Sequence, residues 1–304
     1  MRKEMPLERL AATAMESLEV FYNSVIDIEF FMIKVNTARN ATTLTLRSKN
    51  FIMKKNILFL LCVALGLALS LPARADAKPV LLVLTSHGEL GDTGKQTGFF
   101  LSELTHPLEV FEKAGFAVEM ASIKGGEPPV DGLDLKDAVN ARYWNDPAFR
   151  AKLSATKKLS SLDPKGFSAV FFAGGHRTMW DFPDDEAVQK TIREIYEVGS
   201  PVGAVCHGPV ALVSVKLSDG TFLVAGKDVA AFTNAEEGKV GLTKVVPFLL
   251  ASKLEERGAK HLPAPDFQKQ VVASGPLVTG QNPASAAGVA QKMVELLKDS
   301  PNSP

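Results

Sequence analysis

Cysteine is scarce in this chain, which has only Cys62 and Cys206 among its 304 residues. Cys62 lies in an apolar N-terminal run that we expect to be removed, so Cys206 has no second thiol with which to form an intramolecular disulfide. Exported proteins often carry disulfides. A lone thiol in an oxidising compartment is a liability unless it is buried or useful, which favours a functional Cys206.

An excess of charge of either sign is also absent, because Lys+Arg and Asp+Glu both number 34. No net field therefore attracts nucleic acid or an anionic membrane. The sequence also contains no phosphate-binding loop, dinucleotide fingerprint or basic-aromatic patch. We expect no nucleic-acid partner and no cofactor.

A long apolar run is missing as well. The run Ile57–Leu71 is shorter than the roughly 20 residues of a membrane span. It follows Met53-Lys54-Lys55 and precedes Ala73-Arg74-Ala75, a pattern typical of a secretory signal peptide at 53–75. An uncleaved N-terminal anchor is the alternative. The signal peptide predicts a periplasmic or secreted protein without membrane contact after cleavage.

The chain then divides into three parts. We interpret residues 1–52 as a mis-assigned upstream extension, with Met53 as the true start. Residues 76–304 are long enough for one α/β domain with a large core.

Within that domain, continuous apolar runs at Val80–Leu84 and Ala169–Phe172 are typical of strands buried on both faces. Segments with helical spacing separate such runs, which predicts a mostly parallel sheet with helices on both faces. The expected helices cover 98–114, 184–198, 240–257 and 283–297, and a hairpin is expected around Val271 and Val278.

Cys206 follows an apolar strand and precedes small residues that open a helix, with glycines at 203 and 208. This order predicts a nucleophile elbow, a strained turn that presents a side chain at the open end of a sheet. The helix N-terminus beside it is expected to favour the thiolate. The alternative is a small buried core residue, the commonest fate of a free cysteine.

A nucleophilic cysteine needs a base, an orienting acid and oxyanion donors. His207 is adjacent, and Glu236 and Glu237 are both candidates to orient it. Backbone amides of His207 and of the Gly174-Gly175 loop are candidate donors; an ordinary turn is the alternative for that loop.

Glu103 lies among apolar residues of the first helix. Burial there would raise its pKa and let it carry a proton beside the sulfur, although a solvated helix residue is the simpler interpretation.

Several ordered motifs resemble the ThiJ/PfpI superfamily over residues 79–298. They are Thr97-Gly98-Phe99 with Glu103 and His106-Pro107; Gly174-Gly175-His176 followed by Thr178–Pro183; Ala204–Pro209; and Thr279–Ser285. Within the superfamily, the chain is most similar to the branch of cofactor-independent glyoxalases, called glyoxalase III, and stress-inducible holding chaperones. The resemblance implies a flavodoxin-like sandwich and a homodimer.

The resemblance also implies roles for individual residues. Cys206 matches the nucleophile, Glu103 the helix glutamate that bonds it, and His207 the triad histidine. Glu237 best matches the triad acid, with Glu236 the fallback. The oxyanion and substrate-binding positions fall at four consecutive residues: Gly174, Gly175, His176 and Arg177.

Arg177 departs from the family pattern, which has glycine after the motif histidine. If that position needs a positive φ, arginine is strained there by about 1 kcal/mol. Alternatively, Arg177 reaches into the pocket and favours an anionic substrate. His87, Glu89 and His106 resemble scattered metal ligands, but their spacing is not that of a compact site, so we expect no metal.

The leading hypothesis is conversion of a small 2-oxoaldehyde such as methylglyoxal to a 2-hydroxy acid, without glutathione. A cysteine amidase or peptidase, or a protein deglycase, would use the same residues. A holding chaperone or a redox sensor that oxidises Cys206 to a sulfinate would need no catalysis.

Overall fold

The computed structural model describes residues 78–299. The interpretations of 1–52 as an extension and of 53–75 as a signal peptide lie outside these residues. Among the described helices, none combines the length and the apolar character needed to cross a bilayer.

A seven-stranded sheet forms the centre of the fold, in the order β10-β11-β7-β6-β1-β3-β5. All neighbouring pairs are parallel except β10 and β11, which form the expected antiparallel hairpin. The prediction of a mostly parallel sheet is confirmed. The strands are β1 Val80–Leu84, β3 Val118–Ser122, β5 Lys157–Lys158, β6 Ala169–Phe172, β7 Val202–Val205, β10 Val271–Ser274 and β11 Leu277–Gly280.

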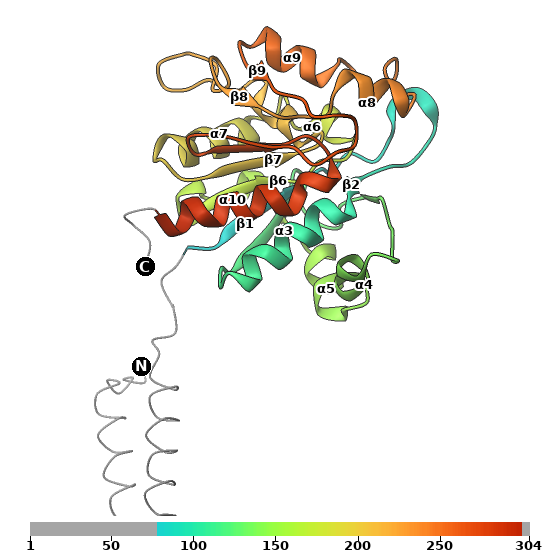
Figure 1. Cartoon of the computed structure of the whole chain (residues 1–304). Helices are drawn as coiled ribbons and strands as arrows, with labels where there is room; N and C mark the ends of the chain where they lie inside the picture. The colour runs from blue at the N-terminus through green and yellow to red at the C-terminus, as the bar shows by residue number, and fades with distance from the viewer. Residues whose placement is uncertain (1–77, 300–304) are drawn as a thin grey trace, which may run out of the picture. The chain divides into compact units, whose positions relative to one another are not determined.

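Helices cover both faces of the sheet (Figure 1). Alternate side chains of β1 enter two different cores: Val80, Leu82 and Leu84 enter one, whereas Leu81 and Val83 enter the other. The first core includes residues of α3 (Leu101–Lys113) and α10 (Ala286–Asp299), which pack against each other. The second includes residues of α7 (Glu186–Glu197). Strands buried on both faces explain the continuous apolar runs.

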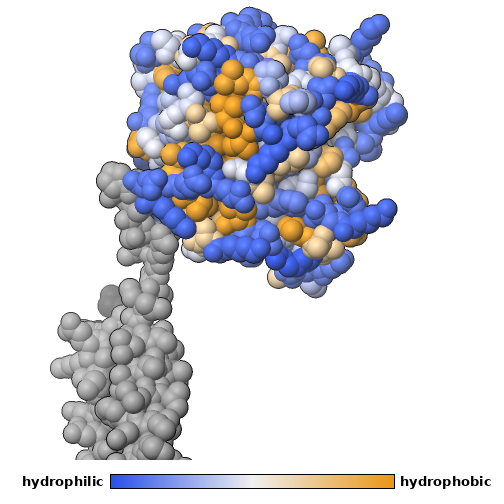
Figure 2. Space-filling view, in the orientation of Figure 1, coloured by the Kyte–Doolittle hydropathy of each residue, from blue (hydrophilic) through white to orange (hydrophobic). Residues whose placement is uncertain are grey.

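The remaining elements are short. They are β2 Phe99–Phe100, β4 Val130–Asp131, α4 Ala138–Trp144, α5 Pro147–Ser154, α6 Thr178–Asp181, β8 Asp228–Val229, α8 Asn234–Lys239, α9 Leu250–Glu256 and β9 Lys260–His261, with 3-10 helices at Gly91–Thr93, Leu159–Ser161, Pro164–Gly166, Gly208–Leu212 and Pro283–Ser285. On the face seen in Figure 2, hydrophobic patches interrupt a mainly hydrophilic surface.

The predicted helix over 240–257 is wrong over most of its length. Only Leu250–Glu256 is helical, as α9, and α8 ends at Lys239. Gly241, with a φ of 76°, and Pro247 lie between them. Both residues are unfavourable inside a helix, and they outweigh the apolar spacing.

The carboxyl ends of β1, β6 and β7 lie next to one another because these strands are parallel neighbours at the centre of the sheet. Residues that follow them therefore meet at one edge, where open α/β sheets bind ligands. These residues are Thr85, the Gly174-Gly175 pair and Cys206.

Gly98 fixes the approach of α3 to this edge. A Cβ at this position would overlap the backbone carbonyl of Pro129, which accepts a hydrogen bond of 2.9 Å from Phe99 N. Next along the chain, Phe100 N donates to Gly174 O at 3.1 Å, so the start of α3 is joined to the Gly174-Gly175 loop.

We therefore expect Gly98→Ala to lower the free energy of unfolding by roughly 1–3 kcal/mol, because backbone must move to admit the methyl group. Urea unfolding measures the loss. Gly166→Ala is the matched control, since a Cβ there meets nothing within 4 Å. Equal stabilities of the two variants would contradict this account.

Candidate active site

Cys206 occupies a strained turn directly after β7. Its φ is 61°, which is the left-handed region that side chains other than glycine rarely adopt. Two backbone hydrogen bonds hold the turn: Cys206 N donates to Gly280 O at 2.9 Å, and Phe232 N donates to Cys206 O at 3.0 Å. The residue is only 5% exposed. The backbone thus has the geometry of a nucleophile elbow.

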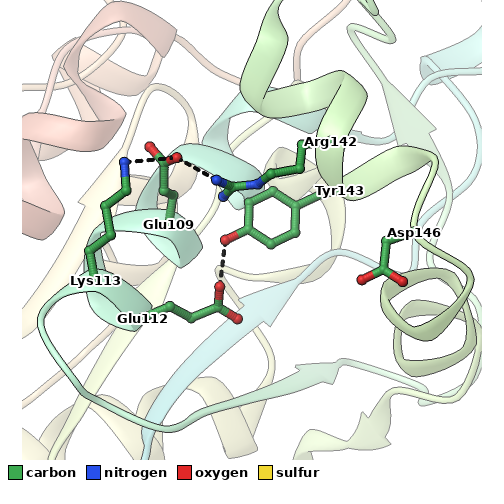
Figure 3. A pocket seen from close by; sticks show the side chains of 6 residues that line it. All are labelled: Glu109, Glu112, Lys113, Arg142, Tyr143 and Asp146. Atoms are coloured by element: carbon green, nitrogen blue, oxygen red, sulfur yellow. Dashed lines mark hydrogen bonds and ion pairs between the residues drawn. The ribbon is translucent and has the colours of Figure 1, made fainter.

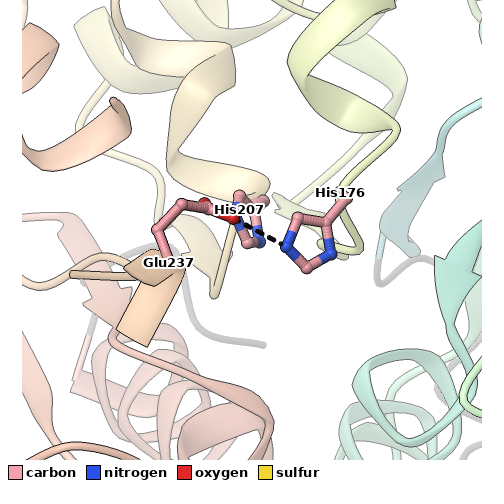
Figure 4. A group of neighbouring side chains, drawn as sticks. All are labelled: His176, His207 and Glu237. Atoms are coloured by element: carbon pink, nitrogen blue, oxygen red, sulfur yellow. Dashed lines mark hydrogen bonds and ion pairs between the residues drawn. The ribbon is translucent and has the colours of Figure 1, made fainter. Parts of the chain in front are cut away.

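His207, Glu237 and His176 form a hydrogen-bonded group (Figure 4). His207 Nδ1 lies 3.4 Å from Cys206 Sγ, and His207 Nε2 lies 2.8 Å from Glu237 Oε2. His176 Nε2 is 3.1 Å from the other carboxylate oxygen of Glu237. Glu237, and not Glu236, is the acid in contact with His207.

The pKa values of this group define its protonation. Burial raises the pKa of Glu237, but hydrogen bonds with His176 and His207 outweigh this effect and lower it to about 2. Burial and the neighbouring His176 lower the pKa of His207 to about 4. At neutral pH, an ionised Glu237 therefore accepts a hydrogen bond from the Nε2–H of a neutral His207. The Nδ1 lone pair then faces the Cys206 thiol, as a general base requires.

Glu103 is completely buried on the first turn of α3, so its interpretation as a solvated residue does not hold. Its Oε2 accepts a hydrogen bond of 2.8 Å from Gly174 N, and the carboxyl also interacts with the Cys206 thiol. Burial raises its pKa to about 8, more than these hydrogen bonds lower it. Glu103 therefore carries a proton at neutral pH.

The expectation that a helix N-terminus favours the Cys206 thiolate is wrong. Only a five-residue 3-10 helix, Gly208–Leu212, follows the cysteine. Burial raises the pKa of the thiol, and the adjacent Glu103 raises it further, whereas the His207 and Gly175 amides lower it less. The thiol is therefore protonated in the resting protein.

Two backbone amides are directed at the sulfur, those of Gly175 and His207. They are the pair expected to stabilise an oxyanion. Gly175 has a φ of 105°, which favours glycine. The Gly174 amide is not part of this pair, contrary to the sequence-based expectation, because it donates to Glu103.

Arg177 is not strained. Its φ is −71°, so the residue has an ordinary right-handed conformation. The buried guanidinium faces the carboxylates of Glu89, Asp131 and Asp181, although burial lowers its pKa more than they raise it. The negative charges of these three carboxylates oppose binding of an anion at Arg177, so they do not support the alternative in which Arg177 favours an anionic substrate.

The predicted candidates for metal ligands do not form a group. His106 bonds to Asp137, which caps α4, at 3.1 Å, and His87 stacks on Trp180. Within residues 78–299, a different group has the spacing of metal ligands: donor atoms of His176, His207 and Glu237 lie within 4.8 Å of one another. The same atoms make the hydrogen bonds that orient His207.

Three residues, Phe232, Asp181 and Glu236, make contacts near the site that the sequence did not predict. The Phe232 ring lies 4.4 Å from that of His207, between centroids. Asp181 Oδ2 accepts hydrogen bonds from Thr85 Oγ1 and the Ser86 amide, and burial raises its pKa to about 6. Glu236 holds a loop, as described below. The motif Met179-Trp180-Asp181 was visible in the sequence, but it gave no sign of these contacts.

A solvent-open hollow of about 600 Å³ lies elsewhere, between the second half of α3 and the α4 region (Figure 3). Its charged lining is largely self-paired: Arg142 and Lys113 bond to Glu109, and Tyr143 donates to Glu112 at 2.6 Å. It contains no nucleophile, so the group around Cys206 is the better candidate site.

The profile of the DJ-1/PfpI family matches residues 96–296. The chain is 34% identical to glyoxalase 3 of Candida albicans over 71% of this chain and 96% of that one. It is 32% identical to a glutathione-independent glyoxalase of Saccharomyces cerevisiae over 73% of this chain and 99% of that one. This chain belongs to the DJ-1/PfpI family, which confirms the resemblance to the ThiJ/PfpI superfamily.

Solved structures agree with the sequence relatives. The crystal structure of glyoxalase III from Candida albicans matches with a TM-score of 0.67 and 31% identity, covering 72% of this chain and 96% of that one. The Rapid Encystment Protein of Francisella tularensis matches with a TM-score of 0.70 and 38% identity, over 72% of this chain and 98% of that one. The predicted flavodoxin-like fold is confirmed.

The proton on Glu103 predicts a pH-dependent stability. The folded-state pKa of about 8 is above the ordinary value of 4.5, so the folded protein holds a proton that the unfolded chain releases. The free energy of unfolding should therefore fall as pH rises from 4.5 to 8, by on the order of 4 kcal/mol. Glu103→Gln should remove this fall.

Urea unfolding of both proteins at pH 5 and pH 8 measures the difference. Glu109→Gln on the same helix, where the carboxylate is paired with Lys113 and Arg142, is the control and should keep the wild-type fall. A Glu103→Gln protein as pH-sensitive as wild type contradicts the protonated state.

Proposed function

We propose that this protein is a glutathione-independent glyoxalase that converts a small 2-oxoaldehyde, such as methylglyoxal, to the 2-hydroxy acid. The observation that carries the proposal is the buried, protonated Glu103 against the Cys206 thiol. A cysteine hydrolase needs only nucleophile, base and oxyanion donors. An additional acid that can give and take a proton at the sulfur suits an isomerisation on the enzyme. The names of the relatives support the same reaction.

The reaction begins when His207 Nδ1 takes the thiol proton and Cys206 Sγ attacks the aldehyde carbon. A hemithioacetal forms, and the Gly175 and His207 amides hold its oxygen. Glu103 lies beside the sulfur and so beside the two reacting carbons. His207 returns the thiol proton to the hemithioacetal oxygen. Glu103 then gives its proton to the ketone oxygen as His207 takes the proton of the former aldehyde carbon, which forms an enediol. His207 passes that proton to the neighbouring carbon and Glu103 regains a proton from the hydroxyl on the former aldehyde carbon, which leaves a 2-hydroxy thioester.

The thioester is then hydrolysed. His207, oriented by Glu237, takes a proton from water, and the hydroxide attacks the thioester carbonyl. The C–S bond breaks, the 2-hydroxy acid leaves and the thiol is restored. One water is consumed and no electrons are exchanged with a cofactor, so the residues of the site suffice for the complete reaction.

Two rival functions have less support. An amidase, peptidase or deglycase would use Cys206, His207 and Glu237 but gives no use to the proton on Glu103. A redox sensor needs a thiolate that oxidises easily, whereas burial raises the pKa of Cys206.

Export and dimerisation belong to this proposal too. The signal-peptide pattern at 53–75 supports a periplasmic or secreted enzyme, and the family resemblance supports a homodimer. N-terminal sequencing of the native protein tests the first: a mature chain that starts at Asp76 is expected, and peptides from 1–52 would contradict the interpretation. Light scattering of the purified protein tests the second, and a monomer would contradict it.

Cys206→Ala should abolish formation of lactate from methylglyoxal in the absence of glutathione, because no other residue can form the thioester. Lactate is measured enzymatically beside the wild type and a Ser154→Ala control, a substitution at an exposed residue of α5 that should retain full activity. Lactate formation by folded Cys206→Ala would overturn the assignment, and its absence in the wild type would overturn the proposed function.

Glu237→Gln should slow turnover about 100-fold, since an unoriented His207 is a poor base for water. The thioester on Cys206 should then accumulate. Mass spectrometry after acid denaturation detects it, because a hemithioacetal reverses under these conditions and a thioester does not. Rapid turnover without any trapped adduct would contradict the role of Glu237.

A further inference from the structure

Phe267 has a strained, left-handed backbone conformation although it is not buried in a core. It and Cys206 are the two non-glycine residues of the described chain with a positive φ, 60° and 61°. Such strain persists only where the surroundings impose it, and it concentrates at functional sites. The strain at Cys206 belongs to the elbow. Phe267 is 46% exposed, so packing in a core does not hold it in place.

The side chain of Glu236 binds the backbone amide of Phe267. Its Oε1 accepts a hydrogen bond of 2.7 Å from Phe267 N, and its Oε2 accepts one of 2.9 Å from Thr233 N. Glu236 is fully buried and precedes Glu237, the residue that orients His207. The loop around Phe267 is thus attached to the same short helix, α8, that carries part of the catalytic group.

Gln281 and Asn282 also bind the loop around Phe267. Both donate to Glu236 Oε1, at 3.1 Å and 2.9 Å. Gln281 Oε1 also accepts from Ala264 N at 2.8 Å, and Asn282 Nδ2 donates to Gln268 O at 2.8 Å. Buried side chains therefore fix the loop at three points, which is more than a surface connection needs.

The ring that this network presents continues a row of rings leading to the thiol. The Phe267 centroid lies 6.3 Å from that of Phe232. Phe232 lies 4.4 Å from His207 and 5.8 Å from His176, and His207 contacts Cys206. The row runs from the exposed Phe267 through the buried Phe232 to the catalytic base.

We propose that Phe267 and Phe232 form an aromatic wall beside Cys206 that selects 2-oxoaldehydes with an aryl or other bulky apolar substituent. This inference rests on the proposed glyoxalase function. The aldehyde carbon must reach the sulfur, so the substituent on the ketone carbon extends back toward the surface. Aromatic rings pack well against an aryl group in offset or edge-to-face contact. Glu236 is the positioning residue that keeps the wall in place.

The test compares kcat/KM for phenylglyoxal and for glyoxal, which lacks a substituent. Phe267→Ala should lower the ratio of the two values about 5-fold. Phe267→Tyr, which keeps the ring, should retain the wild-type ratio, and so should Leu262→Ala, an exposed apolar residue before the same loop. An unchanged ratio in folded Phe267→Ala overturns the proposal.

Phe267→Gly separates the ring from the backbone strain, because glycine adopts a φ of 60° freely. If the ring is the selective element, the glycine and alanine variants should show the same loss of selectivity. A glycine variant with the wild-type ratio would overturn the role of the ring and would assign the preference to the backbone conformation of the loop.

A second assay does not need turnover and so separates failure of this inference from failure of the glyoxalase function. Cys206 is alkylated with iodoacetamide or with N-phenyliodoacetamide, and the Cys206 peptide is followed by mass spectrometry. In Phe267→Ala, the rate of alkylation by N-phenyliodoacetamide divided by the rate with iodoacetamide should fall about 5-fold. Equal relative rates overturn the wall even if the enzyme proves to have another activity.

Glu236→Ala tests the positioning role. It removes the acceptor on which the Phe267 amide and the side-chain amides of Gln281 and Asn282 converge. The variant should show the selectivity of Phe267→Ala in both assays, with thermal unfolding recorded to establish that it is folded. A folded Glu236→Ala protein with wild-type selectivity in both assays overturns the role of Glu236.

Discussion

The contact between Glu103 and Cys206 is the interaction on which the rest of the site depends. Two buried acids lie together, and they cannot both ionise at neutral pH. Burial keeps the proton on Glu103, with a pKa of about 8, and raises the pKa of the thiol. In the proposed reaction, the nucleophile is activated by transfer of its proton to a neutral His207. The same arrangement leaves a carboxylic acid in place to move a second proton once substrate is attached.

The surrounding fold serves to bring these groups together. The parallel neighbours β6 and β7 end at the same edge, which sets the Gly174-Gly175 loop against Cys206. Gly174 has no room for a side chain, because a Cβ would meet Val205 O at 2.5 Å and Glu103 Oε2 at 2.7 Å. Its amide then anchors the glutamate. On the other side, α8 divides two adjacent carboxylates between two tasks: Glu237 orients His207, and Glu236 holds the loop that carries Phe267.

The sequence predicts those parts of this arrangement that depend on local pattern. Buried strands appear as apolar runs, and the small residues around Cys206 indicate the sharp turn after β7. The prediction of a helix over 240–257 gave more weight to apolar spacing than to Gly241 and Pro247. In the structure these two residues lie in a non-helical segment, and only Leu250–Glu256 is helical. Local pattern left Glu103 open between a buried, protonated acid and a solvated helix residue, and it left the roles of Glu236 and Glu237 undivided. The state of Glu103 and these roles depend on burial and on donors from segments far away in the chain, such as Gln281 and Asn282. For Arg177, a strained left-handed conformation was one of two alternatives raised by the motif, and the positive φ lies at Gly175 instead.

The most direct test of the account is the protonation state of Glu103 in the resting enzyme. Infrared difference spectra between the wild type and Glu103→Gln, recorded from pH 6 to pH 10, report the carbonyl stretch of a protonated carboxylic acid. The account predicts that this band is present in the wild type at pH 7 and disappears as pH rises through about 8, where the pKa of Glu103 lies. A carboxylate signal already complete at pH 6 would contradict it, because an ionised Glu103 would have no proton to donate at neutral pH.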